Sequence, residues 1–205
     1  MTRATLTPPA THAARGSLPA SIPQGLEDGR VRDLLALAPE DMSIGPIAGR
    51  LSRVNRYAGA TRWPYSVATH SVLVSRLTSP EMALAGLLHD IPEAFGIGDV
   101  ILPIKRLVPG IRELEDRIVS QLLPSFPDLA AHSAPEVKTA DERAYQLECK
   151  YLRGRWPDPW RGGDEEPPAP VSAHEHALAQ VYLTRELHWW QTRELFLIRY
   201  EELTK

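Results

Sequence analysis

The chain has 205 residues, a length that fits one domain with a sizeable core. Hydrophobic residues make up 43% and charged residues 24%, which excludes a chain that is disordered throughout. A net charge of −3 argues against a nucleic-acid binder with a broad basic face, and no apolar run approaches the ~18 residues of a membrane span. With a single cysteine and no apolar signal sequence, we expect a cytoplasmic protein without an internal disulfide.

The N-terminal residues 1–30 are rich in Pro, Ala, Thr and Gly, and we expect a flexible tail before a single domain at 31–205. Apolar residues then recur at helical spacing over residues 45–57. Ser66 is expected to cap a helix over residues 67–77.

Ser79 and Pro80 mark the start of the next helix, which is predicted to run into His89 and Asp90. Pro92 should kink or restart this helix, because proline lacks the backbone donor that a helix interior needs. Glycines then break the helix, and residues 99–106 are expected to form a connection.

The second half of the chain continues the helical pattern. Further helices are expected over residues 110–122, 136–151, 172–188 and 192–203. Residues 154–170, rich in Pro and Gly, predict an irregular insertion. Alternating strand patterns are absent, so the fold class is predicted to be all-α.

Polar groups stand where apolar residues would be cheaper to bury. His89, Asp90 and Glu93 share one face of an apolar segment, since residues three and four apart are neighbours on a helix. His70 and Asp141 lie on the inward stripes of two other predicted helices.

Each of these groups alone is more often a hydrogen-bonded core residue, and Asp141 could pair with an arginine. Together, His70, His89, Asp90 and Asp141 form a mixed nitrogen and oxygen set, which suits Mn, Co, Fe, Ni or Zn better than Ca.

This ordered set resembles that of the HD-domain metal-dependent phosphohydrolases. The neighbouring sequence is similar to that of bacterial 5′-deoxynucleotidases and their small, often phage-encoded relatives; the matching words are Tyr65-Ser66-Val67-Ala68-x-His70-Ser71, Leu87-Leu88-His89-Asp90-x-Pro92-Glu93-Ala94, Gly98-Asp99-Val100, Pro103-x-Lys105 and Arg56-Tyr57-x-Gly59-x-Thr61. The match covers roughly residues 40–150 and, in scattered form, the last predicted helix.

The resemblance implies a compact HD-domain helical bundle with one divalent metal ion, whose identity among Mn, Co, Fe, Ni, Zn and Mg is left open. The implied metal ligands are His70, His89, Asp90 and Asp141. The implied catalytic residues are Glu93, which would act on the attacking water or the leaving oxygen, and Asp99, which could equally be a helix cap.

By the same resemblance, Arg56 and Lys105 would hold phosphate charge, and Tyr57 could stack on the base or sugar. Two departures are visible. Thr69 stands where relatives commonly carry Glu, which removes a contact to the first histidine, and the interval from Glu93 to Asp99 is one residue longer than usual.

We therefore expect an enzyme that hydrolyses the 5′-phosphate of deoxynucleoside monophosphates. One alternative is a deoxynucleoside triphosphate triphosphohydrolase of the phage dATPase type, and another is a non-catalytic metal-containing module that binds nucleotides. The partner is expected to be a small deoxynucleotide, with no stable nucleic-acid complex and no membrane. Relatives suggest a homo-oligomer, a dimer or higher, in the cytoplasm (the host cytoplasm if the chain is phage-encoded).

Overall fold

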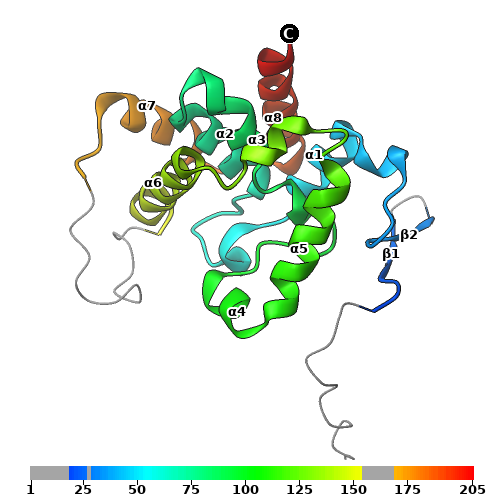
Figure 1. Ribbon diagram of the computed structural model, residues 1–205. Helices are drawn as coiled ribbons and strands as arrows, with labels where there is room; N and C mark the ends of the chain where they lie inside the picture. The colour runs from blue at the N-terminus through cyan, green and yellow to red at the C-terminus, as the bar shows by residue number, and fades with distance from the viewer. Residues whose placement is uncertain (1–18, 27–28, 154–168) are drawn as a thin grey trace, which may run out of the picture.

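The structure, a computed structural model, describes residues 19–26, 29–153 and 169–205 (Figure 1). The described chain is mostly helical, as predicted, with one two-stranded sheet. Its α-helices are α1 (Ile44–Leu51), α2 (Val67–Leu77), α3 (Ala83–Leu88), α4 (Leu102–Leu107), α5 (Pro109–Leu122), α6 (Pro135–Leu152), α7 (Ala173–Tyr182) and α8 (Trp189–Thr204). Short 3-10 helices lie between them: η1 (Pro39–Met42), η2 (Arg56–Gly59), η3 (Pro80–Met82), η4 (Ile91–Ala94) and η5 (Pro127–Ala131).

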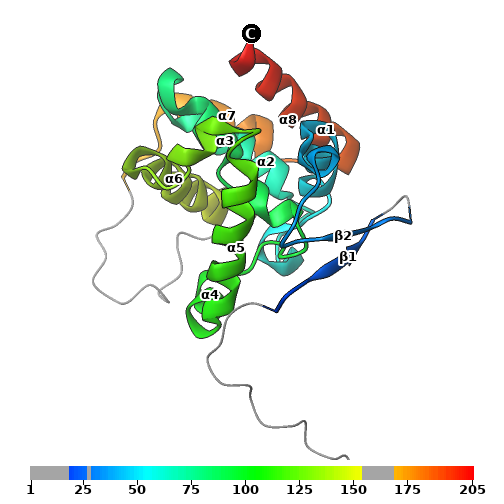
Figure 2. The ribbon, with the colours of Figure 1, turned by 45° about the vertical axis from the view of Figure 1, so that its right-hand side comes forward.

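A small antiparallel hairpin departs from the all-α prediction. Strand β1 (Pro23–Gly25) pairs with β2 (Val31–Asp33) in the register Pro23↔Asp33, Gln24↔Arg32 and Gly25↔Val31. Figures 1 and 2 place both strands at one edge of the helical body, away from α6 and α7. Strand β1 lies within the segment expected to be a tail, so ordered structure begins before residue 31; residues 1–18 lie outside the described chain.

The hairpin braces the segment that follows η4. Arg32 is buried, donates to the Gln24 side chain and to Ala94 O at 3.3 Å, and stacks over the Phe95 ring at 4.7 Å. Gly96 has a φ of +83°, and a Cβ there would lie 2.6 Å from Gln24 Nε2. Because both backbone conformation and space require glycine, the hairpin fixes where the chain turns after η4.

Helix α2 is the centre of the bundle. Its bounds and its Ser66 cap confirm the prediction, since Ser66 Oγ accepts from Thr69 N–H at 3.2 Å. Residues 67–75 are all buried, and the helix packs against α3, α6 and α8. The side chains of residues 67–75, including His70, are therefore shielded from water.

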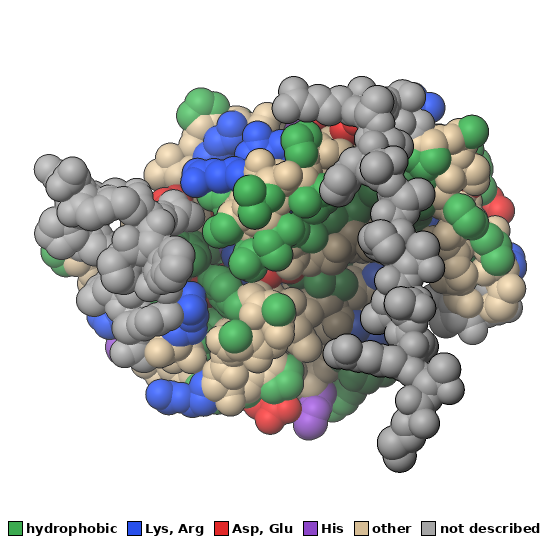
Figure 3. All heavy atoms as spheres, turned by 90° about the horizontal axis from the view of Figure 1, so that it is seen from below, with side chains coloured by type: hydrophobic (Ala, Val, Ile, Leu, Met, Phe, Trp, Pro, Cys, Tyr) green, Lys and Arg blue, Asp and Glu red, His purple; other side chains and the backbone are tan. Residues whose placement is uncertain are grey.

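Two neighbouring segments differ from the prediction. Helix α3 ends at Leu88, before Asp90, and the chain restarts as η4 around Pro92, as the proline predicted. Residues 102–107, expected to be part of a connection, form α4. Figure 3 shows hydrophobic side chains gathered on the face seen from below, and the exposed apolar residues of this region are Ile101, Leu102, Ile104, Leu107 and Val108.

Helices α5 and α6 begin within a residue of the predicted positions, each with a proline in the first turn. Cys149 on α6 is buried, with 1% of its surface exposed. Helix α7 ends at Tyr182, earlier than predicted, and α8 begins at Trp189. Most of the predicted insertion, residues 154–168, lies outside the described chain.

No helix in the part of the chain that the structure describes is both long enough and apolar enough to cross a bilayer.

Candidate metal centre

Three of the predicted ligands meet where α2 passes the end of α3. His70 projects from α2, His89 follows the last residue of α3, and Asp90 leads into η4. One ligand atom from each lies within 4.8 Å of the other two. This group could hold a metal ion.

The protonation of His89 can be read from its partner. Nδ1 lies 2.7 Å from Gly86 O, and because a carbonyl oxygen only accepts, Nδ1 carries the proton. Nε2, the other ring nitrogen, faces Asp90 Oδ2 at 3.2 Å. This buried nitrogen has no hydrogen-bond partner among the described residues. An ion that binds both atoms would lie between them, so the arrangement fits a metal ion.

The same logic applies to His70, which is fully buried. Its Nδ1 lies 2.6 Å from Glu148 Oε1, and its Nε2 faces Asp90 Oδ2 at 3.6 Å and Asp141 Oδ1 at 3.1 Å. Asp141 comes from α6, and its side chain is 46% exposed. The fold thus groups His70, His89 and Asp90 and places Asp141 beside His70.

The local charges favour ionised carboxylates beside a positive group. Burial raises the pKa of Asp90, but His89, His70 and Arg56 together lower it below the ordinary value. Burial also raises the pKa of Asp141, and the adjacent His70 outweighs it, lowering that pKa to about 2. Burial and Arg56 lower the pKa of His70, yet Glu148 and Asp141 raise it to about 10. In the metal-free protein, a proton on His70 therefore takes the place that a metal ion can occupy.

Glu93 lies in η4 beside this group and is 4% exposed. Its Oε1 is 3.7 Å from Lys105 Nζ, and its Oε2 has no hydrogen-bond partner in the described chain. Burial, reinforced by Asp90 and Asp99, holds the pKa of Glu93 well above its usual range. This carboxyl therefore keeps its proton in the metal-free protein, unlike Asp90.

Lys105 reaches Glu93 from α4, the helix that had been expected to be a connection. Its Nζ forms a closer ion pair, 2.7 Å, with Glu115 on α5, which sequence reasoning did not identify. Burial lowers the pKa of Lys105, but the hydrogen bond to Glu115 outweighs it, so the pKa rises. The ammonium group is thus held charged beside Glu93.

Arg56 is buried among three carboxylates. It lies 3.3 Å from Glu148, 3.6 Å from Asp90 and 3.9 Å from Asp99. Burial lowers the pKa of Arg56, but these acids, Glu148 foremost, raise it well above the usual value. The guanidinium group is therefore fixed next to the candidate ligand Asp90.

Tyr57 and Asp99 belong to a strained turn. Tyr57 and Ala58 have φ values of 57° and 51°, in the left-handed region that side chains other than glycine rarely adopt. Asp99 Oδ2 accepts the Tyr57 backbone N–H at 2.8 Å, and the Tyr57 hydroxyl donates to Glu148. Asp99 is thus placed to hold the turn, and the catalytic role that the resemblance implies for it stays a prediction.

Glu148 is the central residue that sequence reasoning missed. It is fully buried and contacts His70, Arg56, Tyr57 and, at 3.0 Å, the Tyr65 hydroxyl. A signal was available, because Glu148 lies two helical turns after Asp141 on the inward face of α6. It supplies from α6 the contact to His70 that the Thr69 departure had put in doubt.

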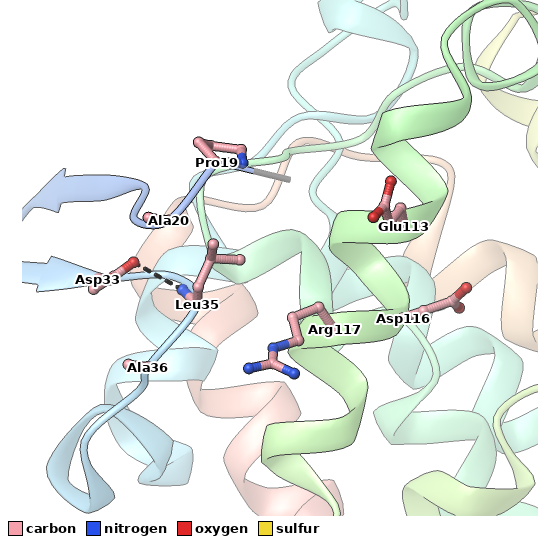
Figure 4. Close-up of a pocket in the computed structure, with 8 residues that line it drawn as sticks. All are labelled: Pro19, Ala20, Asp33, Leu35, Ala36, Glu113, Asp116 and Arg117. Carbon is pink, nitrogen blue, oxygen red and sulfur yellow. Dashed lines mark hydrogen bonds between the residues drawn. The ribbon is translucent and has the colours of Figure 1, made fainter. Parts of the chain in front are cut away.

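A cavity elsewhere on the molecule is a weaker candidate for a metal site. A cavity of about 570 Å³ is lined by Pro19, Ala20, Asp33, Leu35, Ala36, Glu113, Asp116 and Arg117 (Figure 4). It contains no histidine, and its Asp33 carboxylate already accepts from the backbone of Ile22 and Leu35. This cavity therefore lacks the buried, unpartnered histidine nitrogens that distinguish the candidate metal centre.

The chain is similar to two curated proteins. An uncharacterized protein of Rhodobacter capsulatus is 38% identical over 144 residues, which covers 64% of this chain and 73% of that protein. The uncharacterized protein YfdR of Escherichia coli K12 is 38% identical over 102 residues, or 50% of this chain and 56% of YfdR. No protein-family model matches the chain.

Proposed function

The chain belongs to the same family as the uncharacterized Rhodobacter capsulatus protein, and we propose that it is an HD-domain metal-dependent phosphohydrolase acting on deoxynucleoside 5′-monophosphates. The observation that carries the proposal is that His89 Nε2 and His70 Nε2 are buried without a hydrogen-bond partner among the described residues and face Asp90 Oδ2 at 3.2 and 3.6 Å. A divalent ion could bind all three atoms at once.

The ion would be held by His70, His89, Asp90 and Asp141. When bound, a divalent ion supplies charge neutralisation for a phosphate oxygen and lowers the pKa of a water molecule. Both histidines donate Nδ1–H to fixed acceptors, Gly86 O and Glu148, so both rings already turn Nε2 toward the site.

Glu93 would hold the proton that the reaction needs. Its raised pKa and its unpartnered Oε2 support the role of proton donor to the oxygen that leaves the phosphate. Lys105 keeps Glu93 within 3.7 Å and adds positive charge where negative charge develops on the phosphoryl group.

The charge balance favours a monophosphate over the triphosphate alternative. Arg56 and Lys105, the cations that lie beside Asp90 and Glu93, each already face at least two acidic side chains. A triphosphate carries more negative charge than a monophosphate and would need additional free cations. The site as described therefore supports a substrate with a single phosphate.

The test is turnover of a panel of deoxynucleoside mono- and triphosphates with Mn²⁺ or Co²⁺, followed by product analysis. We expect orthophosphate and nucleoside from monophosphates. Release of inorganic triphosphate would instead select the triphosphohydrolase alternative. Binding of nucleotides without any phosphate, pyrophosphate or triphosphate release would reject the enzyme and leave the non-catalytic module.

A further inference from the structure

Glu148 has both carboxylate oxygens engaged, although its side chain is 0% exposed. Oε1 contacts His70 Nδ1 at 2.6 Å and the Tyr65 hydroxyl at 3.0 Å. Oε2 contacts the Tyr57 hydroxyl and lies 3.3 Å from Arg56 Nε. An anion buried this deeply is retained only because every lone pair it presents has a partner.

The Oε1 side of Glu148 acts on the metal centre. Because the carboxylate accepts from His70 Nδ1, the Nε2 atom of His70 points at Asp90 and Asp141. A carboxylate behind a ligating histidine fixes the ring and increases its strength as a ligand.

The Oε2 side acts on the turn that carries Arg56 and Tyr57. Both Tyr57 and Ala58 are in the left-handed region, a conformation that persists only when surrounding contacts hold it. The Tyr57 backbone is held by Asp99, and its hydroxyl is held by Glu148. One carboxylate thus fixes the side chains that face the substrate as well as a metal ligand.

We infer that Glu148 is a positioning residue that couples ion binding at His70 to substrate binding at Arg56 and Tyr57. The inference rests on the proposed function, since it assigns Glu148 to the same site. Coupling of this kind is reciprocal, so the ion tightens substrate binding by the factor by which substrate tightens ion binding. A merely structural buried ion pair would change the stability of the fold and leave this factor unchanged.

The experiment compares Glu148→Gln with wild-type full-length protein. Mn²⁺ affinity is measured by titration calorimetry, without and with a deoxynucleoside monophosphate, and KM and kcat are measured at saturating Mn²⁺. We expect Mn²⁺ affinity to fall about 10- to 100-fold. KM should rise more than kcat falls, and the ratio of the two Mn²⁺ affinities should move toward one. Glu175→Gln, which removes a carboxylate from an ion pair between α6 and α7, is the matched control and should leave all these values at wild-type levels.

Two variants that each remove one tyrosine hydroxyl test the inference if Glu148→Gln does not fold. Tyr65→Phe removes a contact to Oε1, and Tyr57→Phe removes a contact to Oε2. The first should weaken Mn²⁺ binding more than substrate binding, and the second should do the reverse. Equal effects of both variants on both ligands would overturn the inference.

The two proposals fail in distinguishable ways. If the wild type binds Mn²⁺ and turns over substrate, and Glu148→Gln matches it in Mn²⁺ affinity and KM, the inference is wrong and the proposed function stands. If the wild type binds no divalent ion, both are wrong.

Discussion

Helix α6 carries two polar regions that are built on opposite principles. On one side, Arg143 donates to Glu175 of α7 at 3.0 Å, to Gln146 at 2.8 Å, and to the carbonyls of Ala169 and Pro170 at 2.9 and 3.0 Å. We call this region the α6–α7 link. Each donor named here lies opposite an acceptor, so the hydrogen bonds of the link are satisfied without any further group.

The candidate metal centre, which α6 borders with Asp141 and Glu148, is not complete in this way. His89 Nε2 and Glu93 Oε2 are buried without a hydrogen-bond partner among the described residues. The pKa of Glu93 is raised well above its usual range, whereas the Arg143 hydrogen bonds, the largest cause, lower the pKa of Glu175 to about 2. The cluster with unpartnered buried atoms is therefore the candidate binding site, whereas the matched cluster near the surface needs no further group.

The largest expected effect comes from Asp90→Asn. The change removes the carboxylate charge that both histidine Nε2 atoms face. Groups that merely orient ligands are worth about 10- to 100-fold in metal affinity, so we expect loss of a ligand to weaken Mn²⁺ binding by at least about 100-fold. Titration calorimetry measures it, with Glu175→Gln in the α6–α7 link as the control. An Asp90→Asn protein that binds Mn²⁺ like the wild type would show that the mismatch does not mark a metal site.

Glu93→Gln should separate catalysis from folding. Loss of the transferable proton is expected to reduce kcat at least ~10²-fold. Below pH 4.5 the melting temperature of the metal-free protein should barely change, because Gln resembles the uncharged acid that burial imposes on Glu93, and at higher pH the variant should be no less stable than the wild type. Steady-state kinetics and thermal unfolding measure the two values. A wild-type kcat would remove Glu93 from the mechanism.

The two regions should respond to pH with opposite signs. The folded-state pKa of Glu93 is raised above 4.5, so its contribution to stability is full below pH 4.5 and is lost as pH rises toward the raised value. The folded-state pKa of Glu175 is lowered from 4.5 to about 2, so its contribution is present above pH 4.5 and is lost as pH falls toward 2.

Urea unfolding of the metal-free wild type, Glu93→Gln and Glu175→Gln across this pH range tests the contrast. Each variant should abolish its own part of the pH dependence. Because the link lies near the surface, solvent screening limits the Glu175 part to about 1 kcal/mol. If the free energies of unfolding of Glu93→Gln and Glu175→Gln, each relative to the wild type, changed with pH in the same direction, the contrast between the two regions would be wrong.

The smallest expected effect concerns backbone strain beside the metal centre. Ala58 is exposed with φ 51°, so Ala58→Gly should relieve the left-handed conformation and stabilise the fold by about 0.5–1 kcal/mol. Ala60→Gly, at φ −77°, is the control and should not stabilise the protein. Chemical denaturation of both variants provides the comparison.

Much of the fold was predictable because the pattern and the end signals agree. Ser66 and the apolar period define α2, and prolines in the first turn define α5 and α6. Helix α4 was missed because it has no buried residue and therefore no amphipathic pattern. The hairpin was missed because strands of three residues are too short to show alternation.

Helical spacing predicted the four candidate ligands, and the structure groups His70, His89 and Asp90 and places Asp141 beside His70. The role of Glu148 depends on the distance between α6 and η2, which local pattern does not encode. The left-handed turn at Tyr57 runs against the preference of its own residues, so it depends on tertiary contacts such as the one from Asp99.

Cys149, the single cysteine, lies next to Glu148 and is 1% exposed. A thiol reagent can reach it only when α6 separates from its neighbours, so the labelling rate reports the free energy of that local opening. Burial also raises the pKa of the thiol, which slows any reaction in the closed state. An ion held between α2, α3 and α6 would oppose the same separation. The rate at which Cys149 is labelled would therefore fall when an ion binds.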